Sequence, residues 1–314
     1  MLRFLFIFLC CFQIVQAQNK KVLFIIADGI PASELEKANK PAFDAIIKKG
    51  IYLPCYVGGE KGGVTQSPTI SAVGYNSLLT GTWTNKHGVV DNAIKNPNYN
   101  YPTIFKVFKE QYPSKKIGVF STWLDNRTKL VGDGLVQTNY LHVDYHRDGY
   151  ELDTLQFPHD KKAYYIHLID EKVVAEASQV IKDSAPDMSW VYLEYTDDMG
   201  HRYGKSPELD TAISMLDKQI QKLMQAVSYR EMNFNEEWLV IITTDHGRDA
   251  QTGKNHGGQS DSERNTWLIM NKKPAQEVVK TAIVDIFPTI AAYLDIKLPI
   301  PVAQALEGVS LLRK

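Results

Sequence analysis

Hydrophobic and polar positions divide the chain into alternating strand-like and helix-like blocks. Apolar runs, typical of strands buried on both faces, lie within the segments 20–29, 116–122 and 188–194 and fill 238–242. Another strand is expected at 265–270. Helical spacing or helix-end signals mark 31–37, 41–49, 72–80, 101–112, 163–184, 207–232 and 281–294. Strands that alternate with helices predict a three-layer α/β/α fold with a mostly parallel central sheet.

The first 17 residues have the pattern of a cleavable secretory signal peptide. Basic Arg3 precedes an apolar run at 4–11, and the small residues Val15 and Ala17 occupy the −3 and −1 positions. A retained N-terminal anchor is the alternative, although the run is too short for a membrane span. Since no later apolar run approaches ~20 residues, we expect a secreted or periplasmic protein with no membrane span in the mature chain.

The remaining segment, 18–314, is expected to be a single catalytic α/β domain with a small insertion around 124–158. It contains no internal repeat, low-complexity segment or Pro/Gly linker that would divide it. Removal of the signal peptide with Arg3 leaves 34 basic and 36 acidic residues. This chain therefore has no excess of positive charge that would favour a nucleic-acid polymer as a stable partner. Cys55 is the one cysteine left, which excludes an internal disulfide and leaves its role open.

Acidic and imidazole side chains gather where the predicted strands end. The set is Asp28 after the first strand, Asp197 and His201 after the 188–194 strand, and Asp245 and His246 after the 238–242 strand, with Ser71 and His256 in loops that can reach the same edge. In open α/β sheets ligands bind at this carboxyl edge. Each residue alone is explained by a polar turn or a cap. Together, unpaired carboxylates would repel one another, and divalent cations remove that conflict.

Nitrogen and oxygen donors without cysteine suit Zn²⁺ best and Mn²⁺ or Mg²⁺ less well, and there are enough donors for two cations. Two cations ~4 Å apart can clamp the attacking and leaving oxygens of a phosphoryl displacement. Ser71 is expected at the N-cap of the 72–80 helix, where the helix dipole favours an alkoxide or a phosphate. The alternative is that Ser71 only caps this helix.

The motifs keep a fixed order through the chain. They are Asp28 after a strand, Thr80-Gly81 leading to His87-Gly88, Asp197-x-x-Gly200-His201, Asp245-His246-Gly247, His256-Gly257, and a late Asp285-x-x-Pro288-Thr289 helix followed by Leu306-Glu307-Gly308. In this order and spacing the chain resembles the alkaline phosphatase superfamily, and within it the type I phosphodiesterase/nucleotide pyrophosphatase branch.

The resemblance implies an alkaline-phosphatase-like fold with two metal sites. One cation would be held by Asp197, His201 and His256, and the other by Asp28, Asp245, His246 and the nucleophile. Counting back from Thr80-Gly81 places the nucleophile on Ser71, where the branch usually has threonine, and Thr69 is the alternative if the loop is shifted. The same register places on Asn92 the amide that hydrogen-bonds the phosphoryl oxygen.

The resemblance further implies hydrolysis of a small phosphoester through a phosphoseryl intermediate, with phosphodiester or pyrophosphate bonds preferred. Phosphomonoesters come second. Arg127 and Lys129 could bind their terminal oxygens, but the favoured interpretation of both is a solvated surface charge. A non-catalytic metal-containing binding protein is a third interpretation. Nucleotide-processing members have an aromatic residue after the nucleophile, where this chain has Ala72. The sulfatase signature is absent, because no matching arginine follows Ser67-Pro68-Thr69. The oligomeric state stays open.

Overall fold

The computed structural model describes residues 18–278 and 281–312, so the predicted signal peptide lies outside the described residues. The strands are β1 (Asn19–Ala27), β2 (Ile51–Tyr56), β3 (Ile117–Ser121), β4 (Tyr145–Arg147), β5 (Met188–Leu193), β6 (Glu236–Thr243), β7 (Asn265–Met270) and β8 (Thr281–Ala282). The α-helices are α1 (Ala32–Lys37), α2 (Pro41–Lys49), α3 (Ser71–Thr80), α4 (Thr84–His87), α5 (Ile104–Gln111), α6 (Tyr164–Ser184), α7 (Tyr195–Tyr203), α8 (Pro207–Asn233), α9 (Asp261–Arg264), α10 (Ile286–Tyr293) and α11 (Ile300–Ala305).

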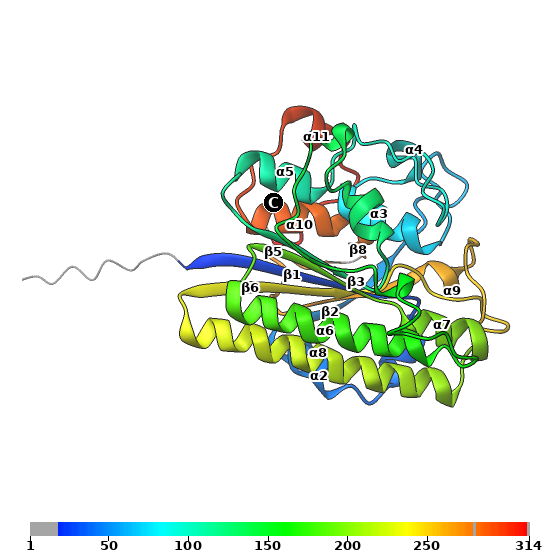
Figure 1. Cartoon of the computed structure of the whole chain (residues 1–314). Coiled ribbons are helices and arrows are strands. Elements are labelled where there is room, and N and C mark those ends of the chain that lie inside the picture. Colours follow the sequence, from blue (N-terminus) through cyan, green and yellow to red (C-terminus); the bar gives the residue numbers. More distant parts are fainter. Residues whose placement is uncertain (1–17, 279–280, 313–314) are drawn as a thin grey trace, which may run out of the picture.

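All eight described strands belong to one sheet with the order β4-β3-β5-β1-β6-β7-β2-β8. The five strands from β4 to β6 are parallel, and β7 runs antiparallel to both of its neighbours, β6 and β2. Helices α3, α5 and α10 lie on one face of the sheet, and α2, α6 and α8 lie on the other (Figure 1). The predicted three-layer α/β/α fold with a mostly parallel sheet is confirmed.

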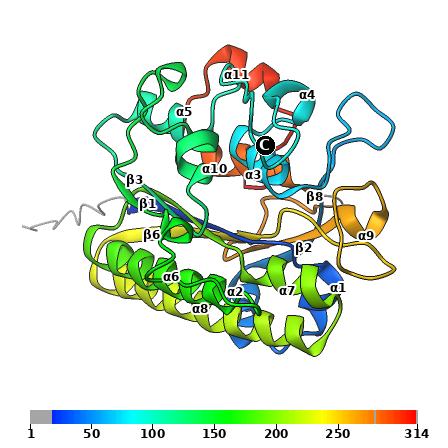
Figure 2. The same cartoon turned by 45° about the vertical axis from the view of Figure 1, so that its right-hand side comes forward.

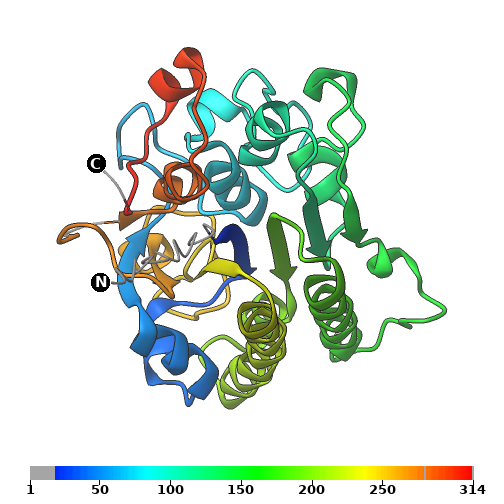
Figure 3. The ribbon, with the colours of Figure 1, turned by 90° about the vertical axis from the view of Figure 1, so that its left-hand side faces the viewer.

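The apolar runs are continuous because both faces of the central strands are covered. Along β1, Val22, Phe24 and Ile26 pack into the core beneath α3, α5 and α10, while Leu23 and Ile25 pack into the core beneath α2, α6 and α8. Figure 3 shows α6 and α8 across the sheet from the C-terminal helix α11. Successive side chains of a strand point to opposite faces, so a strand covered on both faces needs apolar residues at every position.

Three strands are not predicted from the sequence, namely β2, β8 and β4, which lies in the expected insertion. In β2 only Leu53 and Cys55 are buried, and exposed Pro54 interrupts the run, so the strand lacks the continuous apolar pattern. Among the described residues, the two-residue β8 pairs with Cys55 and Tyr56 of β2. The segment 281–294, expected to be one helix, begins with β8 and becomes α-helical at Ile286. Pro288 lies in the first turn of α10, as expected.

The expected insertion at 124–158 is short irregular structure that also supplies an edge strand. It contains a π-helical turn at Asn126–Val131 and two 3₁₀ turns, and β4 pairs in parallel with β3. That 18–314 is one catalytic domain remains a prediction. Within the described ranges, no helix combines the length and the apolar character that crossing a bilayer requires. Cys55 is a free, buried cysteine, and burial raises the pKa of its thiol to about 12.

Candidate metal centre

The seven predicted metal ligands come together at the carboxyl edge of the parallel strands. Asp28 directly follows β1, Asp245 and His246 follow β6 by two and three residues, and Asp197 and His201 lie on α7 after β5. Ser71 begins α3, and His256 comes from the loop between β6 and α9. Figure 2 brings forward the side of the molecule on which α7 and α9 lie. The strand order, with β1 between β5 and β6, explains why ligands far apart in sequence meet here.

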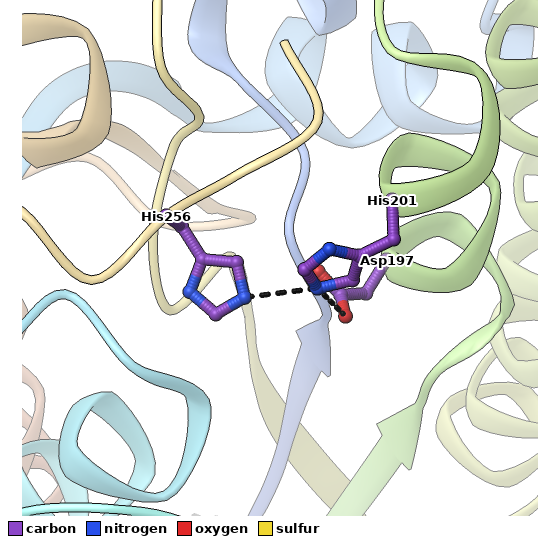
Figure 4. A group of neighbouring side chains, drawn as sticks. All are labelled: Asp197, His201 and His256. Carbon is purple, nitrogen blue, oxygen red and sulfur yellow. Dashed lines mark hydrogen bonds and ion pairs between the residues drawn. The ribbon is translucent and has the colours of Figure 1, made fainter.

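A first cluster consists of Asp197, His201 and His256 (Figure 4). The four-residue spacing of Asp197 and His201 places both side chains on one face of α7, and Nε2 of His201 lies 3.2 Å from Oδ2 of Asp197. Nε2 of His256 lies 3.0 Å from Nε2 of His201. Nδ1 of His256 lies 2.8 Å from the carbonyl oxygen of Thr69, which can only accept, so Nδ1 carries the proton and Nε2 has a free lone pair. This backbone contact orients His256 as a metal ligand requires.

A second cluster surrounds Nε2 of His246. This atom lies 3.4 Å from Oδ1 of Asp28, 3.3 Å from Oδ2 of Asp245 and 3.3 Å from Oγ of Ser71. Both of these carboxylate oxygens are buried, and neither has a hydrogen-bond partner. Nδ1 of His246 is held 2.9 Å from the carbonyl oxygen of Gly247. Two unsatisfied carboxylate oxygens aimed at one imidazole lone pair are costly unless a cation joins them, so these donors fit a divalent metal ion.

The two clusters are in direct contact. Oδ1 of Asp197 lies 3.9 Å from Nε2 of His246, and the rings of His246 and His256 stack with centroids 3.6 Å apart. The residues therefore fit a pair of adjacent cations, with Asp197 between them.

The charges of the site conflict when only protein groups are considered. Burial, followed by repulsion from Asp197, raises the pKa of Asp28 to about 7, and burial together with Asp28 raises the pKa of Asp245 well above its ordinary value. Burial and neighbouring His256 hold the pKa of His246 well below its usual range. Without a cation, burial disfavours the ionised form of both carboxyl groups and keeps the imidazole neutral. A bound divalent cation would favour the ionised carboxylates and the neutral imidazole, which are the forms that bind metal.

Ser71 does not cap α3, contrary to the expectation from the sequence. The helix begins one residue earlier than predicted, so extended Ile70 is the N-cap and Ser71 is the first helical residue. Its hydroxyl faces His246 instead of the helix backbone. A Cβ added at Gly74 would lie 2.7 Å from the carbonyl oxygen of Asp245, so glycine allows α3 to approach the end of β6 closely.

Asn92 lies beside Ser71, as its predicted role requires. Its Oδ1 accepts a 3.0 Å hydrogen bond from the backbone N–H of Ala72, which orients the side chain and leaves the amide N–H groups as donors. Both residues line a cavity of about 130 Å³ together with Trp123 and Glu194. An anion that enters this cavity meets Ser71 and Asn92 together.

Other candidates from the sequence are occupied elsewhere. The Thr69 hydroxyl donates to the carbonyl oxygen of Gly258 and accepts from the N–H of Gly257, so it supports the His256 loop. Arg127 forms ion pairs with Asp133 and Asp148, and Lys129 pairs with Asp125. None of the three lines the cavity beside Ser71.

Three further residues at the site were not predicted from the sequence. Tyr75 and Tyr192 both donate hydroxyl hydrogen bonds to Oδ2 of Asp28, and buried Arg248 binds Asp197. Tyr75 lies one helical turn after Ser71, and Arg248 directly follows the Asp245-His246-Gly247 motif. These positions were the available signals, whereas nothing local marks Tyr192.

Residues 22–295, which include every candidate ligand, match the family described as Type I phosphodiesterase / nucleotide pyrophosphatase. This chain belongs to that family. The resemblance that the motifs indicated is thereby confirmed. This member is 27% identical over 241 residues to human ectonucleotide pyrophosphatase/phosphodiesterase family member 5, covering 74% of this chain and 46% of the relative. The chain therefore spans about half the length of that curated relative.

Solved structures support the same fold. Murine ectonucleotide pyrophosphatase/phosphodiesterase 5, in an inactive form in complex with AMP, superposes with a TM-score of 0.62 at 16% identity, covering 91% of this chain and 99% of that chain. A 2-O GAG sulfatase superposes with a TM-score of 0.66 at 14% identity, covering 95% of this family member and 76% of the sulfatase. At such identities the similarity establishes the fold.

Proposed function

We propose that this protein is a two-metal phosphoester hydrolase that acts on phosphodiester or pyrophosphate bonds with Ser71 as its nucleophile. The observation that carries the proposal is the position of the Ser71 hydroxyl, 3.3 Å from Nε2 of His246 and beside the orphaned oxygens of Asp28 and Asp245. A serine that only stabilised its helix would bond to the backbone of α3. Membership in the phosphodiesterase/nucleotide pyrophosphatase family supports the same reaction class.

In this proposal Asp197, His201 and His256 hold one cation, and Asp28, Asp245, His246 and Ser71 hold the other. Zn²⁺ suits these nitrogen and oxygen donors best. When bound, the cations supply positive charge that favours ionised Ser71 and stabilises the departing oxygen.

The residues of the chain account for a two-step reaction. Oγ of Ser71 attacks phosphorus and the bond to the leaving oxygen breaks, which gives a phosphoseryl group and an alcohol or nucleotide that carries the proton lost by Ser71. Asn92, held by the N–H of Ala72, donates an amide hydrogen bond to a phosphoryl oxygen as charge develops there. Water then cleaves the phosphoseryl bond, which restores the Ser71 hydroxyl and releases the phosphate product.

Diester or pyrophosphate substrates are favoured over monoesters by the charge of the cavity. A monoester dianion would need cationic side chains for its terminal oxygens, and the cavity beside Ser71 is lined by Asp28, Glu194 and Asp197 without lysine or arginine. The murine structural neighbour is in complex with AMP, but Ala72 stands where nucleotide-processing members have an aromatic residue, so the proposal does not extend to a nucleotide substrate in particular. A secreted or periplasmic location, as the N-terminal pattern predicts, fits a protein that meets such substrates outside the cytoplasm.

The test uses purified protein, bis(p-nitrophenyl) phosphate, p-nitrophenyl phosphate and metal analysis. Ser71→Ala is expected to lower diester hydrolysis by roughly 10³-fold or more while bound metal is retained. Ser77→Ala is the matched control, because Ser77 lies on the same helix and its hydroxyl contacts His87 and the α3 backbone. Full activity of Ser71→Ala removes Ser71 from the mechanism. Metal binding without any hydrolysis by the unmodified protein favours the non-catalytic binding protein instead.

A further inference from the structure

Arg248 is a fully buried cation inside the candidate metal centre. Its Nε donates to the carbonyl oxygen of Gly29 over 3.0 Å, and its Nη1 donates to that of Lys254 over 3.1 Å. Its Nη2 donates to the carbonyl oxygen of Asp197 over 2.6 Å and also to Oδ1 of the same residue. A buried guanidinium is costly unless its donors are paired, and here each of these nitrogens has an acceptor.

Each acceptor belongs to a segment that carries a proposed ligand. Gly29 adjoins Asp28, Lys254 precedes His256 by two residues, and Asp197 is itself a ligand. One planar guanidinium therefore joins the ends of β1 and β5 and the His256 loop, and Arg248 itself continues from the end of β6. A lysine cannot make these contacts, because it has a single nitrogen and no rigid fork.

Two glycines provide the space for this side chain. A Cβ added at Gly200 would lie 2.1 Å from Nε of Arg248, and one added at Gly29 would lie 2.7 Å from its Nη2. Gly200 is the glycine of the Asp197-x-x-Gly200-His201 motif. In this chain the motif glycine is thus required by the arginine packed against α7 and not by a turn, because Gly200 lies within the helix.

The guanidinium also divides the two oxygens of Asp197 between different partners. Oδ1 is held by Arg248, whereas Oδ2 faces His201 at 3.2 Å. We propose that Arg248 is a positioning residue that presents Oδ2 of Asp197 to the cation shared with His201 and His256, and that holds the ligand-bearing loops together. The inference rests on the proposed metal sites, but it does not depend on the reaction or its substrate.

Arg248 can affect metal affinity in two opposite ways. As a clamp it orders the ligands, so its loss weakens binding, and outer-shell partners of this kind typically contribute 10–100-fold in metal affinity. As a positive charge it repels a cation, so its loss would tighten binding. The direction of the measured change therefore decides between positioning and simple repulsion.

The experiment measures Zn²⁺ affinity of the purified full-length protein by titration against a competing chelator, with thermal unfolding as a check of folding. Arg248→Met is expected to weaken one of the two Zn²⁺ sites by about 10–100-fold. Arg248→Lys, which keeps the charge but lacks the fork, is expected to recover only part of the loss. The control is Arg230→Met, because Arg230 is also buried but pairs with Glu236 at the opposite end of β6. Unchanged or tighter Zn²⁺ binding by Arg248→Met overturns the proposal.

A second variant disturbs the position of the Arg248 guanidinium without replacing the arginine. Gly200→Ala places a methyl group where the guanidinium lies and is expected to weaken the same Zn²⁺ site. If Gly200 acts only by making room for Arg248, the same change in the Arg248→Met background adds little further loss. Fully additive losses from the two changes contradict the proposed clamp. Because Zn²⁺ binding is measured directly, failure of this inference is separate from an absence of phosphodiester hydrolysis.

Discussion

The Tyr192 hydroxyl donates a 2.6 Å hydrogen bond to Oδ2 of Asp28, and this contact determines which oxygen of Asp28 remains available. Tyr75 donates to the same oxygen, so Oδ1 is left without a partner and faces His246. Tyrosine hydroxyls that bind one carboxylate oxygen keep the carboxylate from rotating, which is the usual role of outer-shell groups around a metal.

Replacement of Tyr192 by phenylalanine is expected to weaken metal binding at Asp28 by about 10–100-fold, because the carboxylate loses an orienting donor. Titration of metal-free protein with Zn²⁺ measures the change. Tyr293→Phe is the control, since the Tyr293 hydroxyl bonds to the backbone of Glu237 at the other end of β6. Zn²⁺ affinity equal to that of the unmodified protein would show that Tyr192 does not orient Asp28.

Two substitutions at Asn92 separate its donor from its acceptor. Asn92→Asp keeps an oxygen that can accept from Ala72 but replaces the donating amide, whereas Asn92→Ala removes both. Since the donor is proposed to stabilise developing phosphoryl charge, we expect both variants to lose roughly 10²–10³-fold in kcat. Steady-state kinetics on bis(p-nitrophenyl) phosphate gives the values. Activity retained by Asn92→Asp would exclude a donor role.

Gly74→Ala tests the close packing of α3 against the end of β6. A glycine-to-alanine change inside a helix ordinarily stabilises it by about 1 kcal/mol. Here the added Cβ would lie 2.7 Å from the carbonyl oxygen of Asp245, and overpacking of this kind typically costs about 1–3 kcal/mol. We therefore expect a lower Tm together with reduced hydrolysis, since Ser71 moves away from His246. A higher Tm with full activity would contradict the close contact.

Asp170 should give the protein a characteristic pH dependence. Burial raises its pKa to about 7 from an ordinary value of 3.8, despite hydrogen bonds from Thr122 and from the N–H groups of Glu194 and Tyr195. Between about pH 4 and pH 7 the folded protein therefore holds a proton that the unfolded chain has released. The stability that this group contributes falls as the pH rises through that interval.

The Asp170→Asn variant cannot titrate, so its Tm should change less steeply between pH 5 and pH 7 than the Tm of the unmodified protein. Thermal unfolding across this range, in a single buffer series at constant ionic strength, gives both slopes. Parallel slopes would mean that Asp170 titrates alike in the folded and unfolded states.

The fold was predictable from the sequence where local pattern and tertiary packing agree. The central strands read as continuous apolar runs because both faces are covered, and α2 and β7 have the bounds that were predicted for them. The pattern was uninformative for β2, which has few buried positions and includes Pro54. It was also uninformative for β4 and β8, which are three and two residues long. An antiparallel β7 was likewise not predicted, because strand direction leaves no trace in the side-chain pattern.

The candidate site was also predictable only in part. Asp and His residues immediately after strands could be recognised because the carboxyl edge of a parallel sheet is a shared location. The N-cap expected at Ser71 was wrong by one residue, since the choice between capping and facing His246 depends on β6, which is 165 positions or more away in the chain.

The sequence alone determined the order of the central strands and of the longer helices, the polar positions at strand ends and the motifs that identify the family, because these depend on residues near one another in the chain. The tertiary structure alone decided which atoms face one another. Asp28 and Tyr192 are separated by 164 positions, and Gly29 and Arg248 by 219. Such contacts depend on the order of the strands in the sheet and on the space beside small residues. Neither can be read from one segment of the sequence, because both depend on segments that are far apart in the chain.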